Sequence, residues 1–243
     1  MDRTDARLED LERRFQSAVQ DLKQLRSERV AELRANWADT EHKISAAMAA
    51  AVSFLFVCSF FVWSLVGQQI DARTLPPGSD LLLDQLPLID LVPVLTVGWL
   101  SIHVLAIYVG VMYCPRRWAF ILATIGLLIL VRTAFVALNP IGPPPGILSL
   151  NASYLLAPLK GILAFENEFF FSGHVAFPYL YSRIFHRIVW ARRTFVWLSI
   201  VMAASVVLTR NHYTMDVLGA YFVTHSVYAL SRWLLGWLDP ERA

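Results

Sequence analysis

The sequence has little charge, little sulfur and no strong excess of either sign. Of its 243 residues, 16% are charged and two are cysteines, whereas 56% are hydrophobic. An ordinary soluble domain has about 25% charged and roughly 45–50% apolar residues, and so apolar a chain cannot bury its hydrophobic surface in one soluble core. A net charge of +2 offers no surface for a polyanion, so nucleic acid is not an expected partner. These shortages exclude a simple soluble enzyme and indicate an integral membrane protein.

The beginning of the sequence lacks the basic region, apolar run and cleavage site of a secretory signal peptide. The first 44 residues instead carry 9 of the 21 Lys+Arg and 10 of the 19 Asp+Glu. Their apolar residues alternate at spacings of three and four, which is the a/d stripe of a coiled coil. We expect 1–44 to be a cytoplasmic helix, either amphipathic against the membrane or a coiled coil that joins copies of the chain through residues 8–29. The stripe consists of Leu8, Leu11, Phe15, Ala18, Leu22 and Leu25.

Beyond residue 44 the sequence has the pattern of a membrane bundle. Each crossing needs about 20 apolar residues, and six segments approach that length. We therefore predict an all-α fold, in which six transmembrane helices occupy residues 45–238 and a short cytoplasmic tail follows at 239–243. The predicted crossings are 45–67, 91–113, 118–138, 173–189, 194–209 and 216–238.

Lys and Arg are unequally divided between the two ends of these crossings. Besides the 9 in the first 44 residues, 8 lie on the same side, and only Arg73, Lys160 and Arg210 lie in the loops on the other side. Because cytoplasmic loops keep an excess of positive charge, both termini are predicted to be cytoplasmic. The loops predicted to face the outer leaflet are 68–90, 139–172 and 210–215.

Ionisable residues at membrane depth are costly and indicate function, and here they gather at the outer side. His174 opens the fourth predicted crossing, and Arg132 lies six residues before Leu138, about 9 Å inside the third. The i,i+4 spacing of His212 and Asp216 lets the carboxylate accept a hydrogen bond from one ring nitrogen. The other nitrogen would then serve as a nucleophile or base.

This set of groups suits phosphoryl transfer, because it offers a nucleophile in His212, a second acid/base group in His174 and a cation for phosphate in Arg132. A zinc site of His174, His212, Asp216 and Glu168 is the alternative chemistry, but an arginine in the same pocket favours an anionic substrate. A purely structural reading also stays open, with Asp216 as a helix cap and Arg132 extending toward the membrane surface.

Four short motifs follow one another across residues 87–224. They are Pro87-Leu88-Ile89-Asp90; Arg116-Arg117 with Arg132-Thr133 and Leu138-Asn139-Pro140; Glu168-Phe-Phe-Phe-Ser-Gly-His174; and His212-Tyr-Thr-Met-Asp-Val-Leu-Gly-Ala-Tyr-Phe-Val-Thr224. In order and content they resemble the motifs of the sphingomyelin synthase family, within the type 2 phosphatidic acid phosphatase superfamily. The first 44 residues lie outside this resemblance.

Several positions depart from the family's pattern. Ile89 replaces a proline, Asn139 replaces the leucine of a Leu-Pro pair, and 166–168 read Glu-Asn-Glu where the family has Cys-Gly-Asp. The phosphatase branch carries an arginine six residues before its last histidine, whereas this chain has Val206 there. The resemblance therefore favours the synthase branch and leaves the head group open.

The resemblance implies a lipid phosphotransferase. His212, oriented by Asp216, would attack a phospholipid donor, and His174 would protonate the leaving diacylglycerol. The resulting phosphohistidine would pass its head group to ceramide or another lipid alcohol of the diacylglycerol type, with no metal or other cofactor. The residues expected to bind the phosphate and head group are Arg132, Ser172, Gly173, Glu168 and Tyr213.

Two further functions stay open from the sequence. If water replaces the lipid acceptor, the same site gives a lipid phosphatase or a phospholipase C-type hydrolase. A non-catalytic scaffold that binds a lipid head group and oligomerises through residues 8–29 belongs to another class, and the presence of all the motif residues argues against it.

Overall fold

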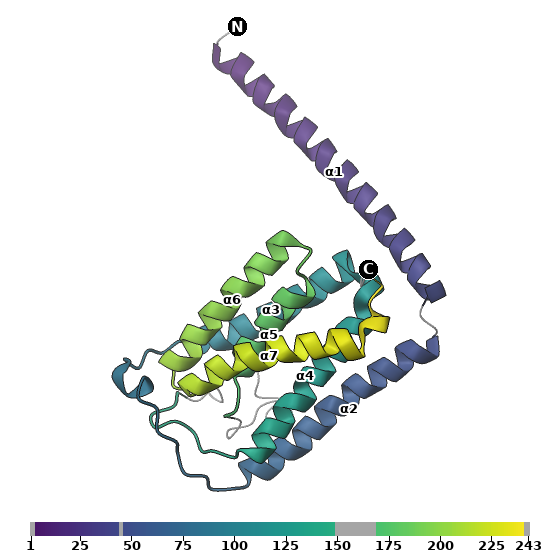
Figure 1. Ribbon diagram of the computed structural model, residues 1–243. Helices are drawn as coiled ribbons and strands as arrows, with labels where there is room; N and C mark the ends of the chain where they lie inside the picture. The colour runs from purple at the N-terminus through teal and green to yellow at the C-terminus, as the bar shows by residue number, and fades with distance from the viewer. Residues whose placement is uncertain (1–2, 44–45, 149–168, 241–243) are drawn as a thin grey trace. The chain divides into compact units, whose positions relative to one another are not determined.

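The computed structural model describes residues 3–43, 46–148 and 169–240, and it divides into two compact units, residues 1–46 and 47–243. The first unit is the helix α1 (Arg3–Lys43), 41 residues long (Figure 1). It contains neither glycine nor proline, so nothing in its sequence breaks the helix. The predicted N-terminal helix is confirmed.

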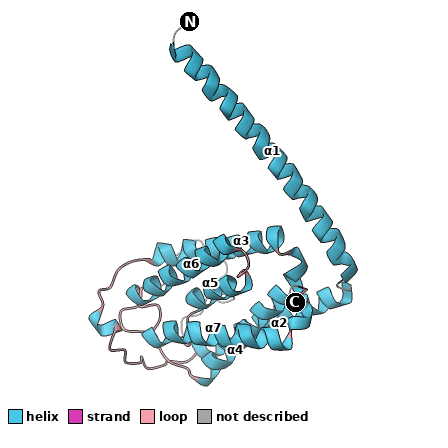
Figure 2. Ribbon diagram, turned by 45° about the horizontal axis from the view of Figure 1, so that its top comes forward, coloured by secondary structure: helices cyan, strands magenta, loops and turns pink. Residues whose placement is uncertain are grey.

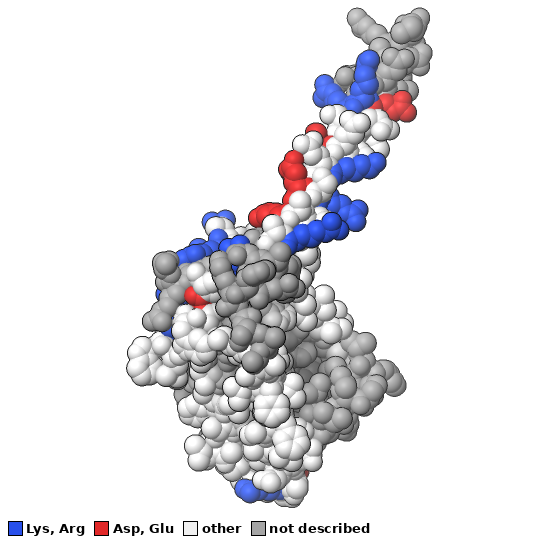
Figure 3. All heavy atoms as spheres, turned by 90° about the vertical axis from the view of Figure 1, so that its right-hand side faces the viewer, with Lys and Arg blue, Asp and Glu red and all other residues white. Residues whose placement is uncertain are grey.

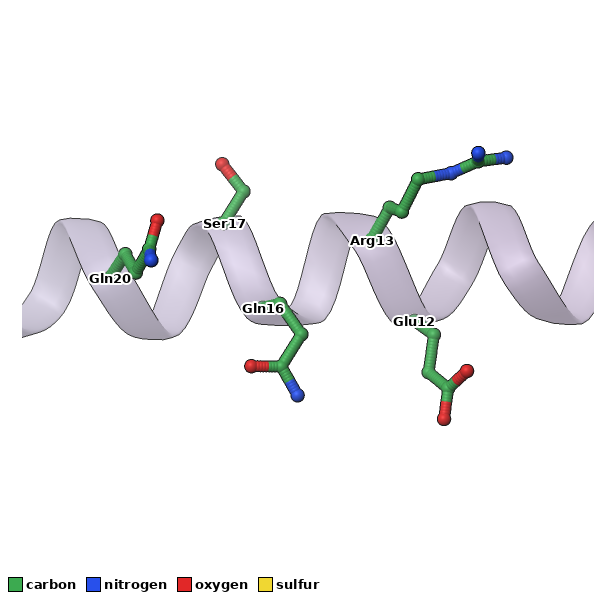
Figure 4. A pocket seen from close by; sticks show the side chains of 5 residues that line it. All are labelled: Glu12, Arg13, Gln16, Ser17 and Gln20. Carbon is green, nitrogen blue, oxygen red and sulfur yellow. The ribbon is translucent and has the colours of Figure 1, made fainter.

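The polar side chains of α1 do not converge on a site. Figure 4 shows Glu12 and Gln16 on one side of the helix and Arg13, Ser17 and Gln20 on the other. In the space-filling view of Figure 3, positive and negative residues both occur along this helix, whereas most of the visible face of the second unit is uncharged.

The second unit, which we call the body, is built only of helices in its described residues, which confirms the all-α class. The buried positions follow a helical stripe, at Leu95, Ile102 and Val109 in one helix and at Phe195, Met202 and Val206 in another, as expected for helices that pack along one face. The α-helices are α2 (Ala46–Asp71), α3 (Val92–Tyr113), α4 (Trp118–Leu138), α5 (Gly173–Ile184), α6 (Val189–Leu208) and α7 (Thr214–Leu234). Short 3₁₀ turns are η1 (Leu83–Gln85), η2 (Pro115–Arg117) and η5 (Gly236–Leu238).

Four helices of the described chain are long and apolar enough to cross a membrane, which supports a multi-pass membrane protein. These candidate spans are Ala50–Asp71, Val92–Tyr113, Pro115–Leu138 and Val189–Leu208. The predicted crossings 173–189 and 216–238 are not among them. The first corresponds to α5, which has only 12 residues and ends at Ile184, and the second corresponds to α7, whose 21 residues include many polar ones.

The short helix α5 lies at the centre of the body. It packs against α3, α6 and α7, and α4 packs against α7 (Figures 1 and 2). Helix α2 runs beside α4, where a Cβ atom added to Gly126 would come within 3.6 Å of the Phe56 Cα. Helix α5 starts at Gly173, beside the predicted site residues Ser172 and His174, and packs against three helices. It therefore fixes the depth of these residues within the bundle.

A buried ion pair closes the end of the body that is opposite the candidate site. The Arg117 guanidinium donates from Nε and Nη2 to the two carboxylate oxygens of Asp239, at 2.9 Å each, and from Nη1 to the Ile184 carbonyl at 2.8 Å. The side chains are 2% and 8% exposed. These three hydrogen bonds join the start of α4 and the end of α5 to Asp239, the first residue of the predicted C-terminal tail.

Replacing Asp239 with alanine is expected to destabilise the body strongly. The substitution leaves a buried guanidinium without its counter-charge, and breaking a buried pair from one side costs about 3–5 kcal/mol. The measurement is the free energy of unfolding in detergent, with Asp84→Ala, at an exposed position of the 3₁₀ turn η1, as the control. Equal unfolding of Asp239→Ala and the control would show that the ion pair does not hold this end together.

Candidate active site

The candidate site begins with a hydrogen-bonded pair at the start of α7. His212 lies two residues before the helix, and its Nδ1 is 3.1 Å from Asp216 Oδ2. The same carboxylate oxygen accepts the Tyr213 backbone N–H at 3.1 Å, which caps the first turn. The side chains of His212 and Asp216 are both buried. With Nδ1–H donated to Asp216, Nε2 of His212 is the nitrogen that keeps a lone pair for a substrate.

The second histidine reaches the same place from α5. The ring centroids of His174 and His212 are 6.5 Å apart, with an angle of 62° between the ring planes. Trp99 of α3 packs against His174 at a centroid distance of 4.8 Å and against Phe177 of α5 at 5.3 Å. One histidine on α5 and one just before α7 therefore flank one position, and Trp99 fixes the orientation of His174.

Three residues before and at the start of α5 connect it to Arg132 and Asp216. The Phe171 carbonyl accepts a hydrogen bond from Arg132 Nε at 3.1 Å, and the Ser172 N–H donates to the Asp216 carbonyl at 3.1 Å. Gly173 lies directly beside the guanidinium, because an added Cβ would be in ordinary van der Waals contact with Arg132 Nε, at 3.6 Å. The predicted group Arg132, Ser172 and Gly173 thus lies together beside the histidines.

Ser172 also places a polar atom at the site. It is the N-cap residue of α5, yet its side chain makes no capping hydrogen bond, and its buried Oγ has no hydrogen-bond partner among the described residues. The start of a helix presents N–H groups and the positive end of its dipole. A hydroxyl, a helix start and a guanidinium therefore adjoin one another at this end of α5, and together they suit an anion.

Tyr213, predicted as a binding residue, connects the site to two loops, at Gly78 and at Gly142. Its hydroxyl accepts the Gly78 N–H at 2.8 Å and donates to the Gly142 carbonyl at 2.9 Å. The Gly142 N–H in turn donates to the Pro76 carbonyl at 3.0 Å. The hydroxyl of Tyr213 is thus hydrogen-bonded to the two loops that contain Gly78 and Gly142.

Asp80 attaches the loop after α2 to the start of α7, and no motif in the sequence indicates this contact. Its Oδ2 accepts the Thr214 N–H at 2.5 Å, and its Oδ1 accepts the Thr214 hydroxyl at 3.1 Å. Partial burial raises the pKa of Asp80, but hydrogen bonds from Thr214, Leu83 and Leu82 outweigh that effect and lower the pKa below its ordinary value. An ionised Asp80 therefore caps the helix that carries Asp216.

Replacing Asp80 with alanine is expected to loosen the start of α7, at a cost of about 1 kcal/mol, as for the loss of an N-cap. Turnover should fall as well, because His212 and Asp216 flank Thr214, and Asp80→Asn should lose less because it keeps one acceptor. Since the folded pKa is lowered, this stabilisation is fully present above the unfolded pKa of about 3.9 and is lost as the pH falls through the folded pKa. Unfolding and turnover measured from pH 5 to 8 should show a constant difference from wild type. A difference that titrates within this range would contradict the assignment.

Aromatic rings complete the described surroundings. Phe169 packs edge-on against His212 at 5.9 Å, and Phe171 is fully buried with its ring 6.3 Å from Phe135. Phe170 also packs against Phe135, at 5.2 Å. Trp99 was not predicted as a site residue. In the sequence it is simply a tryptophan in the half of the second predicted crossing, 91–113, that is nearer the predicted outer side.

Glu168, predicted both as a binding residue and as a possible zinc ligand, lies outside the described residues. Within the described ranges, no three His, Cys, Asp or Glu side chains are grouped so that they could hold a metal ion. The described part of the site thus offers two histidines, one of them paired with a carboxylate, together with a guanidinium and a helix start.

Comparison with known proteins shows a similarity in the region of this site. Residues 167–233 match the family model described as PAP2 superfamily C-terminal. These 67 residues include both histidines, Asp216 and the start of α5, whereas Arg132 and α1 lie outside them. No curated protein and no solved structure matches the chain. The C-terminal part of the body is therefore similar to a superfamily of lipid-phosphate membrane enzymes, and the match does not separate its branches.

Proposed function

We propose that this protein is a membrane phosphotransferase that moves a phospho-head-group from a phospholipid to ceramide or another lipid alcohol. The observation that carries the proposal is the pairing of His212 with Asp216 opposite His174, beside Arg132 and the start of α5. The match to the PAP2 superfamily C-terminal region and the resemblance of the motifs to sphingomyelin synthases support the same reaction class.

In the first step, Nε2 of His212 attacks the donor phosphorus. A P–N bond forms, and the bond between phosphorus and the diacylglycerol oxygen breaks. His174, in its protonated form, gives its proton to that leaving oxygen, so diacylglycerol departs as a neutral alcohol. Asp216 stabilises the positive charge that develops on the His212 ring, because its carboxylate accepts the Nδ1–H.

In the second step, the acceptor alcohol replaces diacylglycerol. His174, now neutral, takes the proton of the acceptor hydroxyl, whose oxygen attacks the phosphorus of the phosphohistidine. The P–N bond breaks, and its electron pair returns to His212 Nε2. A ceramide or diacylglycerol hydroxyl yields a new phospholipid, whereas water yields the free phospho-alcohol.

The negative charge of the transferring group is held by Arg132, the start of α5 and Ser172 Oγ. The arginine supplies a fixed positive charge, and the helix start supplies N–H groups whose orientation does not change during the reaction. Glu168, four residues before Ser172 in the same motif, is proposed from its charge alone as the partner of an amine or quaternary ammonium head group.

For topology, we propose that α5 and α7 complete six crossings and that the site faces the outer leaflet. Helix α5 starts beside Arg132 and ends at Ile184, which is bonded to Arg117. Arg132 comes fifteen positions after Arg117, or about 22 Å at helical rise, so the short α5 covers most of the bundle. The arginine excess predicted to be cytoplasmic includes Arg117, and both termini would lie on that side.

The decisive assay uses purified protein in vesicles that contain a phospholipid with a labelled head group, with ceramide or diacylglycerol added in separate reactions. Mass spectrometry of the lipids should show the label on the acceptor. Release of labelled phospho-alcohol or phosphate, unchanged by either acceptor, would instead assign a hydrolase. Tight binding of the donor without any product would assign a lipid-binding scaffold.

A further inference from the structure

We propose that α1 pairs with α1 of a second copy of this chain as a short parallel coiled coil. The first observation is an apolar stripe that is exposed on the described α1 helix. Leu11, Phe15, Leu22 and Leu25 are each 61–66% exposed, although they recur on one face of a continuous helix. Ala18 completes the stripe, and Leu8 precedes it in the sequence.

The width of the stripe identifies a helix as its partner. From residue 8 to residue 25 every a and d position is apolar, and Val19 at one e position is the one leucine, valine, isoleucine or aromatic residue outside them; this is the seam that a second helix covers in a coiled coil. The stripe ends at the next a and d positions, where Arg29 and Glu32 form an ion pair within the helix at 2.7 Å. The coil therefore comprises about three heptads.

The charges beside the stripe fit a parallel copy. In a parallel pair, each g residue faces the e residue of the following heptad in the other chain. This places Asp21 opposite Arg26 twice, once on each side of the seam. The flanking g–e pairs place Arg14 opposite Val19 and Glu28 opposite Leu33. No two like charges therefore face each other along this stretch.

The overall charge of α1 argues for a protein partner over the membrane surface. The helix has 9 Lys+Arg and 9 Asp+Glu between Arg3 and Lys43, so its net charge is zero. Helices that lie on anionic membranes are typically rich in Lys and Arg on their polar face. A balanced helix with a narrow stripe gains little from such a surface, and it satisfies both its apolar and its charged positions against a copy of itself.

Membrane anchoring makes so short a coil feasible. Three heptads are marginal for association in free solution, but α1 leads within three residues into the α2 helix of the body. Copies embedded in one membrane share the same orientation and a high local concentration, which converts weak pairing into stable pairing. The same anchoring favours the parallel arrangement, because both copies enter the membrane from the same side.

Disulfide crosslinking of the full chain in membranes tests this pairing. With Cys58 and Cys114 replaced by serine, Ala18→Cys at the d position should form a covalent dimer on mild oxidation. Gln20→Cys, two residues away on an outward polar face (Figure 4), is the matched control and should stay monomeric. Failure of Ala18→Cys to crosslink above the Gln20→Cys control, or crosslinking of Phe15→Cys to Ala18→Cys in its place, would overturn the parallel pair.

A charge exchange gives a second test that keeps the native cysteines. The particle mass in detergent or nanodiscs should fall from dimer to monomer with Arg26→Asp, which faces Asp21 of the other copy with a like charge. Adding Asp21→Arg should restore the dimer, because the pair is then complementary again. A dimer that persists in Arg26→Asp and in Leu22→Asp, or a wild-type monomer, contradicts the proposal. Both substitutions lie in the α1 unit, whereas the candidate site is built from residues of the body, so the oligomeric state and lipid transfer can fail independently.

Discussion

Replacing His212 with alanine is expected to abolish head-group transfer, with turnover falling by at least about 10⁴-fold, as when other enzymes lose the residue that makes the covalent bond. The alanine side chain cannot form the P–N bond, and Asp216 then has no ring to orient. The measurement is transfer of a labelled head group in vesicles, with the amount of folded protein matched by its elution profile.

The matched control for this substitution is His225→Ala. His225 lies on the same helix as Asp216, but its side chain is exposed and its ring contacts Tyr179 outside the site. This variant should retain near wild-type transfer. Turnover by His212→Ala at the level of His225→Ala would remove His212 from the mechanism and, with it, the proposed intermediate.

The second large effect is expected at His174, which acts on protons. His174→Gln cannot protonate the leaving oxygen, so transfer from a natural phospholipid should fall by about 10²–10⁴-fold, the usual contribution of a general acid. The loss should depend on the leaving group. A donor that releases p-nitrophenolate needs no proton, so its first-step burst should be largely restored in His174→Gln.

The same activated donor separates the two histidines. His212→Ala should show no burst with either donor, because the leaving group does not change the need for a nucleophile. If His174→Gln is equally impaired with the natural and the activated donor, then His174 positions the site and does not transfer a proton. Comparing both variants with both donors thus assigns a role to each ring.

Long apolar runs made most of the body predictable from the sequence. The segments 91–113 and 118–138 agree with α3 and α4 to within about a residue, because some twenty apolar residues without a break can only form a buried or lipid-facing helix. The fourth crossing, predicted as 173–189, starts where α5 starts but was predicted too long at its other end. Helix α5 ends at Ile184, and the chain turns there before α6 begins at Val189.

The charged core of the site was also visible in the sequence, because His212 and Asp216 are four residues apart and Arg132 lies at membrane depth. Contacts that depend on the path of a loop were not. Asp80 reaches Thr214 across 134 positions of sequence, and no local pattern encodes that approach. The pairing of Asp239 with Arg117 could not be predicted either, because the two residues are 122 positions apart. A lone aspartate near the C-terminal end is instead expected to be part of an exposed tail.

The covalent intermediate on His212 is tested most directly by the stereochemistry at phosphorus. A donor phospholipid with a single chiral phosphorothioate configuration is converted by the wild-type protein, and the configuration of the product lipid is determined. Two successive in-line displacements, first by His212 and then by the acceptor alcohol, predict retention of configuration. Inversion would mean that the acceptor attacks the donor directly, and it would contradict the phosphohistidine mechanism.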